Sequence, residues 1–409
     1  MALRGNGGAA TPALVLISAH ILSMLGFSTY PALLTELRDL WQLSNAQAGF
    51  VGSMFFAGYI ATVSYWTALT DRTDGRKVYF AGSLIALAGC AGFGLAAQGF
   101  ASACAFQVMM GVGIAGTYMP GLHLLSGRIS GASQSRYISF YTSFFGIGTA
   151  LSFALAGLLA PIAGWRGAFV LCSAGSIASA LLVYFGIAAT RRERAPAAAF
   201  SLATLFPLAA WRRVLANRAA TGFILGYCVH CVELFGSRGW IVAFLAFSAS
   251  LSPGASFPWN AAAIAALANL CAVPASILGN EVALRIGRRR WILIVMSASS
   301  LAGIALGLSA PLHWAIVLAL LVGYSMLVMA ESGTLTAGLV AAAPQELRGA
   351  AMGLYSLIGF GGGMLGPSVF GMALDATGGA RSLAAWTWGY VAIGAGCLVA
   401  APLARLAKR

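Results

Sequence analysis

The sequence predicts an all-α membrane protein with twelve transmembrane helices arranged as two six-helix bundles. Of its 409 residues, 60% are hydrophobic and 8% are charged, whereas about 25% of an ordinary soluble domain is charged. Apolar stretches of about 18 to 25 residues recur along the chain, and each can cross roughly 30 Å of hydrocarbon as a helix. A weak internal repeat divides these stretches into two sets of six, which completes the predicted architecture.

The apolar stretches follow one another with short polar connections. They cover residues 13–35, 46–69, 78–98, 101–125, 137–161, 166–189, 219–250, 260–284, 291–310, 312–341, 351–374 and 382–404. Their continuously apolar character argues against a β-barrel, whose strands alternate over about ten residues. The N-terminus has little basic character, so the first stretch is expected to remain as a span.

The basic residues gather on one side of the predicted membrane. Lys and Arg residues lie at the termini and in the connections after even-numbered spans, with the exceptions of Arg38, Arg166, Arg238 and Arg381. Cytoplasmic loops carry an excess of Lys and Arg. The pattern predicts a bacterial-type inner-membrane protein with both termini in the cytoplasm. It accounts for the net charge of +14 without a nucleic-acid partner.

The longest polar segment separates two similar halves of the chain. Residues 190–218 are predicted to be a cytoplasmic linker between a bundle at 1–189 and a bundle at 219–409. Three short matches recur across it at an offset of about 212 residues, namely "AHILSMLG" with "VHCVELFG", "GRK" with "GRR" and "YTSFFGIG" with "YSLIGFGG". Parallel repeats of this kind predict a cavity that opens to either side of the membrane.

The connection between the second and third spans carries a motif. It reads "TALTDRTDGRKVY" and resembles the signature loop of the major facilitator superfamily of secondary transporters. The resemblance implies the fold of that superfamily, alternating access, and a gating role for Asp71, Arg72, Arg76 and Lys77. A carboxylate there can accept charge-assisted hydrogen bonds or sit at a helix N-terminus. The alternative is that these charges only set the topology in a solvated turn.

Two further connections resemble the same superfamily. "NEVALRIGRRRW" matches the signature at Arg285, Gly287, Arg289 and Arg290, and we expect a similar gating role there. It has Asn280 and Leu284 where the signature has Gly and Asp. "PQELRGAAMGL", before the eleventh span, is also similar. The resemblance therefore extends over the whole chain in length and loop placement.

The eleventh span contains "GFGGGMLGPSVFG". Small residues let helices approach closely in lipid, and a Gly-Pro pair allows a bend. We expect Gly362, Gly366 and Pro367 to form a hinge or packing face. The fifth span lacks the Gly-Pro pair that resemblance to drug-exporting antiporters of the superfamily would require.

Ionisable residues stand out in the middle of the spans. His230 and Glu233 share one face of the seventh span, Arg238 follows them, Glu331 lies near the middle of the tenth span, and His20 mirrors His230 in the first. Buried ionisable groups are costly, so they usually face a cavity or a partner. We expect a proton-coupling or substrate site here. The alternative is a structural network in which Glu233 bonds to His230 or to Arg238.

Other side chains are candidates to line a cavity, and several function classes remain open. The candidate lining residues are aromatic or small and polar: Tyr30, Tyr59, Tyr118, Tyr141, Tyr227, Trp240, Asn269 and Tyr324. We expect a monomeric, proton-coupled transporter of a small organic solute, with export favoured because a cationic compound fits the acidic centre. The alternative is uptake of a metabolite or carboxylate read by Arg238.

A third class, a non-transporting receptor or an embedded enzyme, lacks support in the sequence. It contains no set of nucleophile, base and orienting residue, and no metal-binding or cofactor motif. The expected partners are therefore the solute, protons and the lipid bilayer, with no cofactor and no metal.

Overall fold

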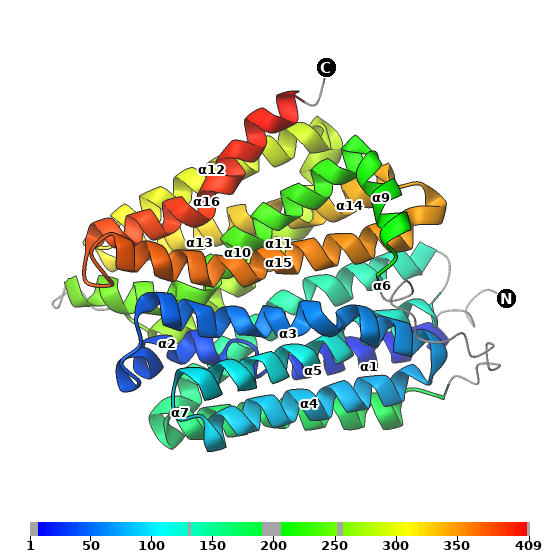
Figure 1. Ribbon diagram of the computed structural model, residues 1–409, viewed down its shortest axis with the longest axis horizontal. Helices are drawn as coiled ribbons and strands as arrows, with labels where there is room; N and C mark the ends of the chain where they lie inside the picture. The colour runs from blue at the N-terminus through cyan, green and yellow to red at the C-terminus, as the bar shows by residue number, and fades with distance from the viewer. Residues whose placement is uncertain (1–6, 130–131, 190–205, 252–256, 407–409) are drawn as a thin grey trace. The chain divides into compact units, whose positions relative to one another are not determined.

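The fold is all-helical, as predicted (Figure 1). The computed structural model describes residues 7–129, 132–189, 206–251 and 257–406, and these ranges contain no β-strand. Within them, nine helices are long and apolar enough to cross a membrane, and two shorter apolar helices cover residues 11–23 and 383–398. One of the nine, Arg136–Gly186, covers two predicted spans, so the helices are consistent with twelve crossings.

The helices of the N-terminal part correspond to the first six predicted spans. They are α1 (Gly7–Ser23), α2 (Thr29–Leu40), α3 (Asn45–Arg72), α4 (Gly75–Ala96), α5 (Phe100–Ser126), α6 (Ala132–Ser143) and α7 (Phe145–Gly186). The first span is broken, because α1 ends at Ser23 and α2 begins at Thr29. Within α7 the chain turns at Gly164, whose φ of 68° is a backbone conformation that glycine adopts readily.

The helices of the C-terminal part correspond to the last six predicted spans. They are α9 (Leu208–Ala216), α10 (Arg218–Leu251), α11 (Ala261–Ile286), α12 (Arg288–Leu308), α13 (Trp314–Ala330), α14 (Ser332–Ala342), the 3₁₀ turn η1 (Gln345–Leu347), α15 (Arg348–Ala376) and α16 (Leu383–Leu406). The tenth predicted span is divided between α13 and α14 at Glu331. Of the predicted linker, residues 190–205 lie outside the described residues, and α9 forms most of the remainder.

The chain divides into two compact units. The first is drawn from Met1–Thr29, Ala57–Ala97 and Ala101–Phe206, and the second from Tyr30–Phe56, Gln98–Phe100 and Pro207–Arg409. Most of helix α2 and the first part of α3 therefore group with the C-terminal helices. The bundle boundaries at 189 and 219 stay a prediction.

The second unit is built around a close pair of helices, α10 and α15, which run side by side (Figure 1). A Cβ added at Gly362 would collide with the carbonyl of Cys228, and one at Gly366 would collide with the carbonyl of Val232. The indole Nε1 of Trp240 donates to the carbonyl of Pro367 at 2.9 Å. These contacts place the glycines and the proline of the predicted packing face against α10, which carries the candidate site.

Candidate functional site

A buried polar contact between His230 and Glu331 joins α10 to the break between α13 and α14. His230 and Glu331 have no exposed surface, and their Nδ1 and Oε1 atoms lie 3.0 Å apart. The ring of Tyr227 stacks beside His230, with centroids 5.7 Å apart. The pair thus occupies the interior of the second unit, with one member on a continuous helix and the other at a helix interruption.

The helix interruption places Glu331 in the core. The carbonyl of Ala330 accepts a hydrogen bond from Trp291 Nε1 of α12 at 3.0 Å. Gly279 of α11 approaches the same carbonyl so closely that an added Cβ would collide with it. Two neighbouring helices therefore hold the interruption. Glu331 directly precedes α14, where the positive end of a helix dipole favours a carboxylate.

Glu233 lies close by in the sequence but has a different partner. Its Oε2 accepts a hydrogen bond from Ser299 Oγ of α12 at 2.9 Å, and only 1% of the residue is exposed. The alternative interpretation from the sequence, in which Glu233 bonds to His230 or Arg238, was wrong about these partners. A position on a shared helix face does not determine which neighbouring helix supplies the partner. Here α12 supplies the partner of Glu233, and the residue preceding α14 is the partner of His230.

Each member of this cluster of His230, Glu233 and Glu331 has one polar atom left over. His230 Nε2, Glu233 Oε1 and Glu331 Oε2 have no hydrogen-bond partner among the residues that the structure describes. Buried polar atoms are nearly always paired, so unpaired ones call for an explanation. His230 and Glu331 lie close enough for proton binding at one to affect proton binding at the other.

Arg238 lies further along α10 and lines a small cavity. The cavity has about 20 Å³ of space for the centre of a water-sized sphere, roughly that needed by one water molecule. Helices α10, α11, α13 and α16 enclose it, and its lining residues are Leu234, Ser237, Arg238, Ile241, Asn269, Leu321, Tyr324, Ser325, Val328 and Tyr390. Two of the residues that the sequence suggested for a cavity wall, Asn269 and Tyr324, are among them.

The guanidinium of Arg238 makes no hydrogen bond or ion pair with any residue inside the described ranges. The residue is 8% exposed. The sequence places it in the outer part of the span, and the structure adds that it faces the cavity rather than Glu233.

His20 belongs to the first unit and has an environment of its own. It is fully buried, and its ring stacks on Tyr141 at 4.4 Å between centroids and tilts against Tyr118 at 5.2 Å. Neither ring nitrogen has a hydrogen-bond partner within the described part of the chain. The symmetry of His20 with His230 is therefore one of sequence position, because an aromatic cluster takes the place of the carboxylate partner.

The first loop that resembles the superfamily signature, between α3 and α4, is organised by Asp74. Its carboxylate caps α4 by accepting from the backbone N–H of Arg76 and pairs with the Arg76 guanidinium at 2.7 Å. Arg76 also donates to the carbonyls of Ile187 and Tyr184 at 3.0 and 3.3 Å. Burial alone would raise the pKa of Asp74, but the hydrogen bonds and charge of Arg76 outweigh it and hold that pKa below its ordinary value.

The resemblance also singles out Asp71, Arg72 and Lys77 in this loop. Asp71 is more than half exposed and lies 3.7 Å from His123 Nδ1. Lys77 is exposed and Arg72 is partly buried. Asp74 was missed because it occupies the position of a glycine in the signature. The signal was present nonetheless, because Asp directly before a helix is a preferred cap.

The second loop that resembles the signature is a tight turn between α11 and α12. Gly287 ends α11 with a φ of 94°, which glycine tolerates and other residues rarely adopt. Arg285 is exposed and Arg289 is partly buried. The match to the signature at Gly287 is thus explained by the backbone conformation.

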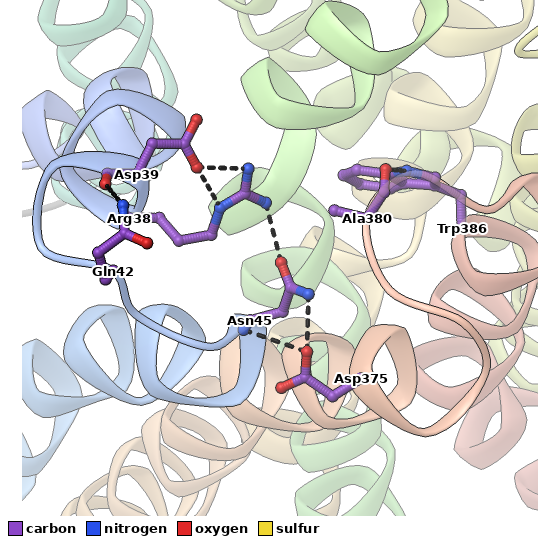
Figure 2. A network of polar contacts seen from close by, with 7 residues as sticks. All are labelled: Arg38, Asp39, Gln42, Asn45, Asp375, Ala380 and Trp386. Carbon is purple, nitrogen blue, oxygen red and sulfur yellow. Dashed lines mark hydrogen bonds and ion pairs between the residues drawn. The ribbon is translucent and has the colours of Figure 1, made fainter.

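A polar clasp of Arg38, Asn45 and Asp375 joins α2, α3 and α15 within the second unit (Figure 2). Asp375 Oδ1 accepts from the Asn45 side chain at 2.7 Å, and its Oδ2 accepts from the Ala46 N–H at 2.8 Å. Asn45 Oδ1 accepts from Arg38 Nη1 at 2.9 Å. The carboxylate at the end of α15 therefore caps the first turn of α3. Sequence reasoning missed this clasp, since Asn45 and Asp375 lie 330 residues apart.

Comparisons with known proteins agree with this architecture. The niacin transporter NiaP of Acinetobacter baylyi is 29% identical over 143 residues, which cover 34% of this chain and 31% of that protein. The organic cation/carnitine transporter 7 of Arabidopsis thaliana is 26% identical over 150 residues, covering 36% and 29%. The match thus spans about a third of the length of these curated relatives.

Solved structures match over nearly the full length. A bacterial homologue of the human lysosomal transporter Spinster, in an inward-facing and unoccupied conformation, has a TM-score of 0.79 at 18% identity, covering 98% of this chain and 97% of that one. The nucleoside transporter NupG has a TM-score of 0.71 at 16% identity, covering 97% and 100%. At these identities the likeness shows the fold.

A family profile covers most of the sequence. The profile described as Major Facilitator Superfamily matches residues 16–367. Together with the apolar helices, this match identifies the chain as a multi-pass membrane protein that belongs to the Major Facilitator Superfamily.

Proposed function

We propose that this protein is a proton-coupled secondary transporter of a small organic solute that works by alternating access. The observation that carries the proposal is the buried cluster of His230, Glu233 and Glu331 in the apolar helices of the second unit. Family membership and the names of the relatives, which include niacin, carnitine and nucleoside transporters, support the transport of small solutes.

The cluster supports proton coupling for an energetic reason. A charged side chain at the centre of a bilayer costs at least about 2.5 kcal/mol, so a change in the charge of the cluster alters the relative stability of states that hydrate it differently. Each member retains one polar atom without a partner among the described side chains. A proton can therefore enter or leave without the loss of the existing bond between Glu233 and Ser299.

The direction of transport and the charge of the solute are linked. Export of a cationic compound fits an acidic centre, as the sequence suggested. Arg238 supports the second candidate, uptake of a carboxylate together with a proton, because this buried cation has no ion-pair partner within the described ranges. We favour the carboxylate, which also agrees with the name of the niacin transporter relative.

The setting of this activity is an inner membrane of bacterial type. We infer that both termini and the 190–218 linker lie in the cytoplasm, because the basic residues concentrate there. We also propose that the chain acts as a monomer. The gating loops at Asp71–Lys77 and Arg285–Arg289 then lie on the cytoplasmic side as well. In this proposal Asp74 and Arg76 stabilise the first loop and Gly287 shapes the second.

A reconstitution experiment tests proton coupling. The full chain is placed in liposomes with a pH-sensitive dye inside, and solute-driven proton flux is measured with nicotinate, nicotinamide and carnitine as probes. We expect Glu233→Gln to abolish the proton flux of the transported probe while exchange of labelled for unlabelled solute persists, and Glu331→Gln to behave alike. Glu281→Gln on the exposed part of α11 is the matched control.

Two outcomes decide the proposal. Loss of proton flux in both cluster variants, with exchange retained and the control unchanged, supports the coupling role. Proton flux that stays at the wild-type level in both variants contradicts it.

A further inference from the structure

We infer that the cavity lined by Arg238 is a binding site for one monovalent anionic group, either the carboxylate of an organic solute or an inorganic anion such as chloride. The cavity is separate from the His230, Glu233 and Glu331 cluster, since none of these three residues lines it. The role of the site in transport rests on the proposed function, whereas its affinity for an anion does not.

The first argument is the uncompensated charge of Arg238. A guanidinium carries five N–H donors and stays protonated in proteins, and an isolated buried charge is strongly unfavourable. Arg238 is 8% exposed and has no carboxylate partner among the described side chains. Glu233 is not that partner, because its carboxylate accepts a hydrogen bond from Ser299 and makes no ion pair with Arg238 in the described structure.

The second argument comes from the two polar neighbours. Asn269 Nδ2 donates to the carbonyl of Ala265 at 2.8 Å, which leaves its Oδ1 without a partner in the described structure. The hydroxyl of Tyr324 is likewise unpaired with respect to the described residues. The two residues are 3% and 2% exposed, and both line the cavity. The Tyr324 hydroxyl can donate to an anion, while Asn269 Oδ1 can accept from a remaining donor of Arg238.

The third argument is the size and character of the walls. About 20 Å³ of space for a sphere centre admits one small group and excludes a large drug-like molecule. Leu234, Leu321 and Val328 supply apolar walls, which strengthen an ionic interaction by lowering the local dielectric. A water molecule would fit but would not neutralise the guanidinium, so an anion is the complementary occupant.

The position of the cavity connects it to the proton cluster. Arg238 lies one to two turns after Glu233 on α10, and Val328 lies about one turn before Glu331 on α13. An anion bound at Arg238 and a proton bound in the cluster therefore both contact residues on or next to α10 and α13. The two bound species carry opposite charges. This arrangement favours joint binding of a carboxylate and a proton, as the proposed uptake requires.

A binding experiment tests the site without any gradient. The purified full chain in detergent, in a chloride-free zwitterionic buffer, is titrated with sodium chloride, sodium acetate, sodium nicotinate and neutral nicotinamide while its thermal unfolding midpoint is followed. We expect saturable stabilisation by at least one anion and none by nicotinamide. Stabilisation by chloride identifies an inorganic anion, and stabilisation by nicotinate or acetate alone identifies a carboxylate.

Variants assign the effect to Arg238. Arg238→Gln should weaken the apparent anion affinity at least tenfold, and Arg238→Lys should retain part of it. Arg381→Gln, at an exposed arginine outside the cavity, is the matched control and should bind as the wild type does. If Arg238→Gln does not fold, Tyr324→Phe keeps the charge and removes one donor, and it should weaken binding several-fold.

The failures of the two proposals are distinguishable. Anion binding that is absent from the wild type, or unchanged in both Arg238→Gln and Tyr324→Phe, overturns the anion site even if proton-coupled transport is observed. Intact, Arg238-dependent binding in a protein that moves no protons overturns the coupling proposal and leaves the anion site standing.

Discussion

At the scale of single residues, Asp74 shows how one short carboxylate performs two tasks. It caps α4 through a backbone N–H and forms a bidentate contact with Arg76, which in turn reaches two carbonyls at the end of α7. Its side chain and that of Arg76 are each 16% exposed. Solvent therefore screens this pair less than an ordinary surface ion pair.

Substitutions at Asp74 should separate the cap from the charge. Asp74→Ala removes both and should destabilise the protein by about 1 to 2 kcal/mol, whereas Asp74→Asn keeps a good cap and should cost less. Thermal unfolding in detergent measures the difference. Asp39→Ala, at an exposed acid paired with its neighbour Arg38, is the control for loss of a surface charge. Equal stability of the wild type and Asp74→Ala would contradict the capping role.

The same pair predicts a dependence on pH. Because the pKa of Asp74 is lower in the folded protein than its ordinary value, its ionic contribution is fully present above pH about 4, the ordinary value for Asp. It is lost as the pH falls through the lower folded value. The stability advantage of the wild type over Asp74→Asn should therefore shrink in acid, as unfolding of both proteins at neutral and acidic pH would reveal.

At the scale of elements, the contact between α10 and α15 depends on missing side chains. Gly362 and Gly366 let the backbone of α15 approach that of α10 closely. The approach is so close that a Cβ added at either glycine would collide with a carbonyl of α10. Close approach of this kind replaces the hydrophobic driving force that helices lack in lipid. The break at Glu331 depends in a similar way on Gly279, which leaves room for the carbonyl of Ala330.

Alanine substitutions in α15 provide a matched comparison. Gly366→Ala should destabilise the protein by about 1 to 3 kcal/mol through overpacking. Gly361→Ala, where nothing lies within 4 Å of the added Cβ, should be neutral or stabilising, because Ala has the higher helix propensity. Unfolding midpoints in one detergent compare the two. If the Gly366→Ala protein is as stable as Gly361→Ala, then α10 and α15 can move apart without loss of stability, which would contradict the prediction.

At the scale of the whole molecule, the distribution of charge predicts orientation. The distribution of basic residues predicts that the linker lies in the cytoplasm and that the turn between α15 and α16 lies on the opposite side. In intact cells, a membrane-impermeant maleimide should label Arg381→Cys and should label Ala209→Cys of α9 only after permeabilisation. The wild type, whose seven cysteines fall inside predicted spans, is the control. The reverse labelling pattern would invert the topology.

The sequence by itself determined the helical membrane fold, the approximate spans and the family. Run length and loop charge are local properties, so a single chain displays them without reference to its packing. The interruption at Glu331 was not foreseen, because the tenth apolar stretch shows no Pro there to mark a break. The residues that contact the backbone at this break, Trp291 and Gly279, lie on other helices.

Only the tertiary structure decided which residues of the candidate site contact one another. The sequence singled out His230, Glu233, Arg238 and Glu331, because ionisable residues are rare in apolar spans. It could not assign Glu331 to His230, Ser299 to Glu233, or the cavity to Arg238. Which side chains meet depends on the rotation and depth of helices whose contacting residues lie 66 and 101 positions apart, and those are set by packing across the whole unit rather than by any local pattern.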